Sequence, residues 1–178
     1  MQIPIGFGEC ERHVGGPADM EHGDQNILKK SHENRIKFQD KKNEVLVTYI
    51  GNTYKTRIGL IDKLRKKKFI HISDKLRFED YMIKINEYKF VLCPRGCGTD
   101  THRFWETILM GSVPIIESCG LDDLYNKFPC IILDNFDNLN IKCLENFEFD
   151  NKKSLNTEKY LVLENLKKEI FSFFEKGV

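Results

Sequence analysis

The chain has 178 residues, of which 40% are hydrophobic and 31% charged. This length and composition are typical of one globular domain with its own core, and they exclude an intrinsically disordered protein. The formal net charge of +1 gives no global electrostatic reason to expect nucleic-acid binding. Basic residues nevertheless outnumber acidic ones within residues 29–103, and their local field favours an anionic small molecule as ligand.

Residues 1–43 are weakly patterned, and we expect an extended stretch at Ile3–Phe7 followed by loop with at most one helical turn. From residue 44 onward, apolar runs bounded by turn residues predict strands, and apolar residues spaced three and four apart predict helices. The expected strands are Glu44–Ile50, Phe69–Ser73, Phe90–Cys93, Val113–Ile116 and Cys130–Leu133. The expected helices are Tyr54–Lys67, one whose buried stripe is Phe78, Tyr81, Met82 and Ile85, then Thr101–Met110, Leu121–Lys127 and Tyr160–Lys176.

Strands that alternate with helices at this spacing predict an α/β fold, with a parallel sheet covered by helices on both faces. Right-handed crossovers make such a sheet Rossmann-like. We therefore divide the chain into a weakly structured leading segment, residues 1–43, and a Rossmann-like domain, residues 44–178.

The sequence contains no apolar run of membrane-spanning length, and its N-terminus lacks the layout of a signal peptide. Its six cysteines show neither zinc nor thioredoxin spacing, and Cys93 and Cys130 lie inside apolar runs, so we expect them to be buried thiols. These features favour a soluble, cytoplasmic protein. A lumenal Golgi or ER location stays open if an anchor lies outside this chain.

The most informative segment runs from Lys89 to Ser118 and reads as strand, glycine-bearing loop, helix and strand. In open parallel sheets the ligand site lies beyond the carboxyl ends of the strands. Gly96 and Gly98 would let backbone N–H groups approach an anion closely, and the helix that begins near Thr101 adds unpaired N–H groups and partial positive charge. The segment therefore predicts a site for a phosphate-bearing ligand.

Arg103 lies in the first turn of that helix, where a cation opposes the helix dipole by about 0.3–1 kcal/mol. A bound diphosphate would reverse the sign of that effect. Glu106 shares a face with Arg103, and its carboxylate can accept hydrogen bonds from a ribose diol. The alternative is a plain Arg103–Glu106 salt bridge on an exposed helix.

Two neighbouring side chains have two interpretations each. His102 is either a donor to a phosphate or sugar hydroxyl, or a surface histidine with no role. Asp100 is either a helix N-cap or a ligand contact. We expect Phe104 and Trp105 to pack in the core. No P-loop, dinucleotide-binding, zinc-protease or serine-hydrolase motif occurs, and the scattered histidines predict no metal site.

The segment FVLCPRGCGTDTHRFWETILMGSVPIIES resembles the core block of the exostosin-like glycosyltransferases, in the C-terminal half of their two-domain GT-B fold. The shared pattern is an apolar strand, Cys-Pro, a glycine loop, an arginine shortly before a glutamate, and a Gly-x-x-Pro strand. A looser likeness extends from about Ile3 to Asn138. It includes IPIGF, a His-Gly-Asp at 22–24, the strand-Gly-Asn-x4-Arg element that ends at Arg57, and LDDLY–PCIIL.

The resemblance implies a nucleotide-sugar donor as substrate, with no metal and no further cofactor. By position, Arg103 would contact the donor diphosphate and Glu106 the donor ribose, and Arg57 would be a second phosphate contact. The remaining expected donor-site residues are Asn52 near the end of the first strand, the loop glycines Gly96 and Gly98, and, on the sugar side, Arg95, Asp100 and His102. Helix dipoles and basic side chains would stabilise the departing diphosphate.

In GT-B enzymes the acceptor site, and usually the catalytic base, come from an N-terminal half about as large as this whole chain. We therefore name no catalytic base, and a missing domain or a partner chain is an open possibility. The leading interpretation is a glycosyltransferase, or its donor-binding domain, that transfers a sugar to a glycan or protein hydroxyl. The alternatives are a non-catalytic nucleotide- or nucleotide-sugar-binding module and an unrelated Rossmann-like phosphate-ester enzyme.

Overall fold

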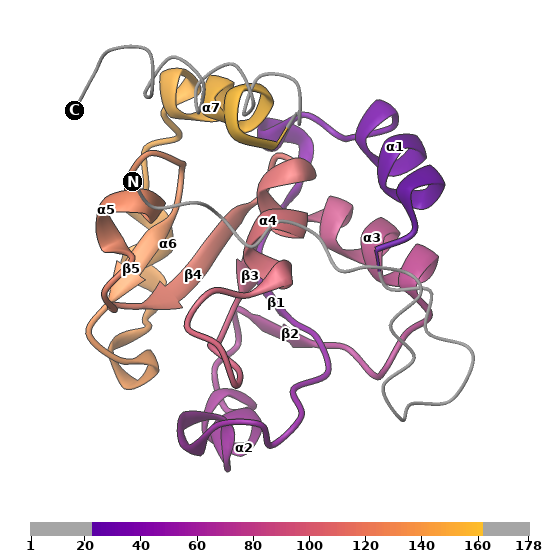
Figure 1. Cartoon of the computed structure of the whole chain (residues 1–178). Helices are drawn as coiled ribbons and strands as arrows, with labels where there is room; N and C mark the ends of the chain where they lie inside the picture. Colours follow the sequence, from indigo (N-terminus) through magenta and orange to yellow (C-terminus); the bar gives the residue numbers. More distant parts are fainter. Residues whose placement is uncertain (1–22, 162–178) are drawn as a thin grey trace, which may run out of the picture.

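A computed structural model describes residues 23–161 of the chain. They form a five-stranded, all-parallel sheet with the strand order β2-β1-β3-β4-β5 (Figure 1). The predicted α/β, Rossmann-like class is confirmed. The strands are β1 Lys42–Val47, β2 Ile70–Ile72, β3 Tyr88–Leu92, β4 Val113–Glu117 and β5 Ile131–Leu133.

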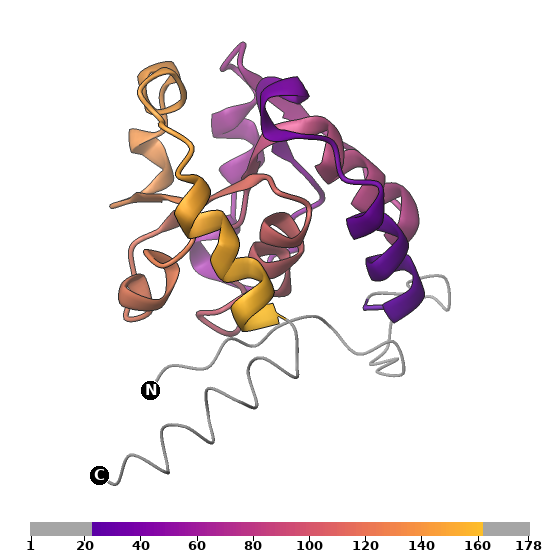
Figure 2. The same cartoon turned by 90° about the horizontal axis from the view of Figure 1, so that it is seen from above.

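Helices connect the strands and pack on both faces of the sheet (Figures 1 and 2). The first apolar cluster joins α1, α3, α4 and α5 to one face, and the second joins α2 and α6 to the other. The α-helices are α1 Gln25–Glu33, α2 Leu60–Leu64, α3 Phe78–Glu87, α4 His102–Leu109, α5 Asp122–Tyr125, α6 Ile141–Glu145 and α7 Asn151–Leu161. Single 3-10 turns are η1 Phe38–Asp40, η2 Lys55–Arg57 and η3 Phe136–Asn138.

The two apolar clusters follow from the period-two alternation of side chains along a strand. Leu46 and Val91 belong to the cluster under α3 and α4, whereas Phe90 and Leu92 belong to the cluster under α2. Strands that are apolar on both faces are typical of parallel sheets covered on both sides. This is why the strand signal in the sequence is a continuous apolar run.

The strand order places a topological switch between β1 and β3. After β1 the chain crosses to the edge strand β2, and it then returns to add β3 on the other side of β1. The connections that leave β1 and β3 therefore run over opposite faces, which opens a crevice at the carboxyl ends of these two strands. The key loop predicted from the sequence follows β3 directly and lies at this crevice.

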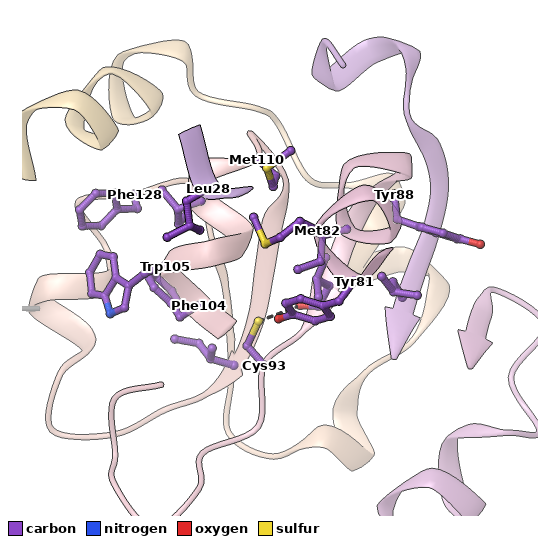
Figure 3. Packing of buried hydrophobic residues seen from close by; sticks show 14 of the residues in the cluster. Leu28, Tyr81, Met82, Tyr88, Cys93, Phe104, Trp105, Met110 and Phe128 are labelled. Atoms are coloured by element: carbon purple, nitrogen blue, oxygen red, sulfur yellow. Dashed lines mark hydrogen bonds between the residues drawn. The ribbon is translucent and has the colours of Figure 1, made fainter. Parts of the chain in front are cut away.

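Helix α4 behaves as predicted at its end and on its apolar side. The chain leaves it through Gly111, whose φ of 67° is left-handed, as the predicted glycine cap requires. Phe104 and Trp105 are fully buried. They pack edge-on, with ring centroids 4.7 Å apart, and Phe128 lies 5.2 Å from Trp105 (Figure 3). Their predicted role as core residues is confirmed.

The helix predicted over Tyr54–Lys67 is wrong in its extent. The structure divides it into the turn η2 and the short helix α2, with Gly59 between them at a φ of 70°. A left-handed residue cannot continue an α-helix, so the apolar spacing on either side belongs to two separate elements. Strand β1 also ends earlier than predicted, at Val47, which leaves residues 48–50 in the loop that borders the crevice.

The leading segment contains more structure than one turn. Helix α1 has nine residues, and the Asp24 side chain caps it by accepting hydrogen bonds from the amides of Asn26 and Ile27 at 2.8 and 3.0 Å. Leu28 is buried, and the helix lies beside α3 (Figure 2). Helix α1 was not predicted because it buries few side chains, so its mostly polar sequence shows no apolar stripe. The boundary at residue 43 stays a prediction.

Some expectations lie outside the described residues, namely the extended stretch at Ile3–Phe7 and most of the helix at Tyr160–Lys176. The helix α7 begins earlier than this prediction, at Asn151, and it packs against α4. Within residues 23–161, the five cysteines are free thiols; Cys93 is buried, and Cys130 is partly exposed rather than buried as expected. None of the helices in this part of the chain is long and apolar enough to span a membrane.

Candidate functional site

A pocket of about 520 Å³ lies at the switch point predicted for the ligand. Its walls come from the segments that follow β1, β2 and β3 and from the first turns of α4. This volume falls within the range of small-molecule sites, about 300–1,000 Å³. Seven of the nine sequence-predicted site residues line it: Arg57, Gly96, Gly98, Asp100, His102, Arg103 and Glu106.

Arg103 and Glu106 both line this pocket from one side of α4. The alternative of a plain exposed salt bridge does not describe them: residues 23–161 contain no ion pair between the two, and Glu106 is only 4% exposed. Tyr81 of α3 donates a hydrogen bond of 2.7 Å to Glu106 Oε2. The carboxylate is therefore held by a neighbouring helix rather than by the arginine one turn away.

The Arg103 guanidinium is only partly satisfied. Its Nη2 donates to the carbonyl of Tyr49 at 2.8 Å, whereas Nε and Nη1 are buried and have no hydrogen-bond partner within the described part of the chain. Thr48, on the wall of the same pocket, has a hydroxyl oxygen that is also buried and without a partner among the described residues. A buried donor without a partner costs about 1–3 kcal/mol, so these atoms indicate where a ligand acceptor would bind.

Burial raises the pKa of Glu106 above its ordinary value, although the Tyr81 hydrogen bond and the Arg103 charge both lower it. The pKa of the Tyr81 hydroxyl is raised well above its ordinary value by burial and by the neighbouring Glu106. The tyrosine therefore stays protonated and serves as a fixed donor. Tyr81 was not among the predicted site residues, because it lies in the buried stripe of α3 and its spacing is that of a core residue.

Arg57 lines the pocket, but its guanidinium is used within the protein. Its Nε donates to the carbonyl of Arg95 at 2.6 Å, Nη2 to that of Pro94 at 2.7 Å, and Nη1 to that of Gly51 at 3.4 Å. These bonds join the loop after β1 to the loop after β3. Burial lowers the pKa of Arg57, and the nearby charge of Arg103 lowers it further. These contacts directly support a role for Arg57 in positioning the two loops.

The glycine at position 96 has a steric reason other than the one we expected. A Cβ there would lie 3.2 Å from Nη2 of Arg57 and 3.4 Å from Oγ1 of Thr53. Neither Gly96 nor Gly98 has a positive φ. Glycine at position 96 therefore lets the loop close tightly over the Arg57 guanidinium, where a larger residue would have to displace these side chains.

Asp100 is a loop anchor. Its carboxylate accepts hydrogen bonds from Trp105 Nε1 at 2.9 and 3.0 Å, from the Tyr125 hydroxyl at 2.9 Å and from the Thr101 amide at 2.8 Å. Thr101, not Asp100, is the N-cap of α4, since its Oγ1 accepts from the amide of Phe104. Asp100 thus ties the loop to α4 and α5 while it borders the pocket.

The last two predicted residues lie elsewhere. Arg95 lines a separate cavity across the loop, and its guanidinium carbon lies 4.0 Å from the centroid of the Tyr54 ring. Asn52 is exposed and lines neither cavity. Within residues 23–161, no group of three or more histidine, cysteine, aspartate or glutamate side chains is placed to hold a metal ion.

The fold and the pocket define an α/β protein with an open parallel sheet and a pocket at its topological switch point. A scan against models of known protein families finds none that matches the chain, and a search of curated proteins finds no match. The resemblance to the exostosin-like glycosyltransferases therefore stays a prediction, and it depends on the residues quoted for it.

Proposed function

We propose that this protein is a glycosyltransferase, or the donor-binding domain of one, that takes its sugar from a nucleotide sugar. The observation that carries the proposal is the pair on α4, one turn apart on the wall of one pocket. Arg103 has two buried nitrogen atoms without a partner in residues 23–161, and Glu106 is a buried carboxylate. A cation can bind the phosphates of a nucleoside diphosphate, and a neighbouring carboxylate can accept hydrogen bonds from its ribose diol.

The phosphate end of the ligand would lie at Arg103. Its Nε and Nη1, which have no partner within residues 23–161, can each donate a charge-assisted hydrogen bond to a phosphate oxygen, and the amino end of α4 adds partial positive charge beside it. The electrostatic repulsion between Arg103 and Arg57 would also fall when an anion is bound. These three contributions favour a diphosphate over a neutral ligand.

The ribose would lie at Glu106. Its carboxylate accepts the Tyr81 hydroxyl on Oε2 and borders the pocket. A carboxylate oxygen can accept more than one hydrogen bond, so the group can take the hydroxyls of a ribose without releasing Tyr81. Tyr81 would then fix the direction in which the carboxylate faces.

In the proposed reaction the bond between the anomeric carbon and the diphosphate oxygen breaks, and a bond to an acceptor hydroxyl oxygen forms. The electron pair of the broken bond leaves with the nucleoside diphosphate, whose charge Arg103 and the helix dipole would stabilise. The acceptor proton goes to a base that we do not assign. A nucleotide-sugar-binding module without transfer is the second candidate, because each contact assigned here is to the donor.

Calorimetric titration with UDP and GDP, together with turnover of radiolabelled nucleotide sugars with and without glycan acceptors, tests the proposal. We expect saturable binding of one nucleotide and transfer to an acceptor. Binding without transfer or hydrolysis would favour the module. No binding of either nucleotide, with the pocket intact by spectroscopy, would reject both.

A further inference from the structure

A second cavity, of about 280 Å³, lies at the carboxyl ends of β4 and β5. The loop that follows β3 separates it from the first pocket, and Thr101 lines both. Its walls include residues from the ends of three strands and from the segment after β1. Arg95, expected from the sequence on the sugar side of the donor, lines this cavity, whereas the proposed diphosphate and ribose contacts lie in the first pocket.

Two buried polar atoms at this cavity have no partner in the described part of the chain. One is Nε of Arg95 and the other is Oγ1 of Thr56. Most buried polar atoms in folded proteins are hydrogen-bonded, so each exception calls for an explanation. One face of the Arg95 guanidinium is covered by the Tyr54 ring, at 4.0 Å, which fixes its orientation. A ligand acceptor that reached these atoms would supply the missing partners.

The charges of the lining residues exclude a second phosphate site. Glu117 and Asp134 contribute two carboxylates against the single cation of Arg95, so an anion would meet net negative charge. A Glu117 oxygen already accepts a hydrogen bond from the amide of Phe136 at 3.3 Å. The lining therefore combines two carboxylates, which accept hydrogen bonds, with a guanidinium and a hydroxyl, which donate them.

We propose that this cavity binds a neutral polyhydroxylated ring of the size of one monosaccharide. A sugar hydroxyl donates and accepts at once, so a single ring can donate to Glu117 and Asp134 while it accepts from Arg95 and Thr56. The volume is at the lower end for small-molecule sites, which suits one ring rather than an oligosaccharide. Because a polyol is neutral, its binding also leaves the net charge of the guanidinium and the two carboxylates unchanged.

The ring has two possible sources, the sugar of the bound donor or a separate acceptor sugar. The shared wall at Thr101 is compatible with both. Polyol binding stands on the lining of this cavity alone, whereas its link to glycosyl transfer rests on the proposed function. The experiment therefore has one part without nucleotide and one part with it.

In the first part, a panel of methyl glycosides is titrated into the nucleotide-free protein while backbone amide NMR shifts are followed. The Asp134→Asn variant is compared with wild type, and Asp123→Asn, which changes an exposed carboxylate outside the cavity, is the matched control. We expect shifts centred on Thr99 and Cys119. We also expect the affinity to fall about tenfold in Asp134→Asn and to stay at the wild-type value in Asp123→Asn.

In the second part, UDP, GDP and their sugar conjugates are titrated into the same three proteins by calorimetry. If Asp134→Asn weakens a conjugate but not its free nucleotide, the cavity holds the donor sugar. If methyl glycosides bind unchanged when nucleotide saturates the protein, the cavity holds a separate sugar. The proposal is overturned if no glycoside shifts the cavity resonances and Asp134→Asn binds every conjugate as wild type does. Failure of nucleotide binding alone would reject the proposed function and leave this inference standing.

Discussion

Two regions of the molecule bring an arginine to the same pocket, and the two arginines are used differently. In the loop region Arg57 donates to three backbone carbonyls, so its guanidinium holds two loops together. In the first turn of α4, Arg103 donates to one carbonyl and keeps two buried nitrogen atoms without a partner among the described residues. Hydrogen-bond saturation, rather than charge or position in the sequence, separates the positioning residue from the residue that we propose for ligand binding.

Of the substitutions proposed here, Arg57→Ala should have the largest effect on stability. Removal of the guanidinium leaves carbonyl groups of both loops without a donor, and hydrogen bonds to charged groups contribute about 1.5–3 kcal/mol each. Because Arg57 is partly exposed, we expect an overall loss of about 2–4 kcal/mol in the free energy of unfolding. Urea denaturation measures it, with Lys55→Ala on the exposed side of η2 as the control. A variant as stable as wild type would contradict the positioning role.

Arg103→Ala should weaken ligand binding more than it weakens the fold, the reverse of what we expect for Arg57→Ala. Among the contacts of residues 23–161, the variant loses one hydrogen bond and also two unsatisfied donors, so its stability should change by less than that of Arg57→Ala. Its affinity for the nucleoside diphosphate should fall by about 1.5–3 kcal/mol, the range for a charge-assisted hydrogen bond. Calorimetry on both variants checks this, and unchanged affinity in Arg103→Ala would remove its proposed role.

Lys41 extends the comparison to a cation far from the pocket. It is 5% exposed, and its Nζ donates to the backbone carbonyl and the Oδ1 of Asn86 at 2.6 and 2.9 Å. Burial, helped by the nearby Arg35 charge, lowers the pKa of Lys41 to about 7. Above that pH the unfolded chain binds the proton more tightly than the folded one, so the stability rises with pH.

We expect a gain of about 1 kcal/mol in the free energy of unfolding between about pH 7 and pH 8. Lys41→Met, which cannot titrate, should lack this gain. The urea midpoint measured across that range in both proteins provides the test. Parallel pH profiles for the variant and wild type would show that Lys41 is charged when folded.

Tyr81→Phe should have the smallest effect near neutral pH, and its signature is a pH profile. The Tyr81 hydrogen bond lowers the pKa of Glu106, against the larger effect of burial. Its loss raises that pKa further, so the carboxylate protonates at a higher pH. The affinity for UDP relative to pyrophosphate should therefore begin to fall at a higher pH in the variant as the solution is acidified. Superimposable profiles would mean that Tyr81 does not orient Glu106.

The sequence was sufficient for the parts of the fold that depend on local patterns. The apolar runs of β3 and β4, the buried stripe of α3 and the glycine cap at Gly111 each follow from the spacing of a few neighbouring residues. Their combination was enough to predict a parallel sheet with a pocket beyond β3. Helix α1 could not be predicted from such spacing, because its single buried position, Leu28, is surrounded by polar residues.

The internal contacts of the site could not be predicted in the same way. Arg57 bonds to backbone carbonyls, which every residue carries, so no residue type signals its role. Tyr81 meets Glu106 only because α3 and α4 pack into the same apolar cluster on one face of the sheet, and Asp100 meets Tyr125 only because α5 returns beside the loop. Both are contacts between residues distant along the chain, made by side chains that also fit a core or a capping role.

The most direct test of the central claim is the titration of Glu106→Gln with UDP and with pyrophosphate. Glutamine keeps an oxygen that can accept the Tyr81 hydroxyl, so the fold should be preserved, but it is a weaker acceptor for a ribose diol. We expect the variant to bind UDP more weakly than wild type and to bind pyrophosphate with nearly the wild-type affinity. Equal losses for both ligands, or no loss for either, would contradict the assignment of Glu106 to the ribose and of this pocket to a nucleotide sugar.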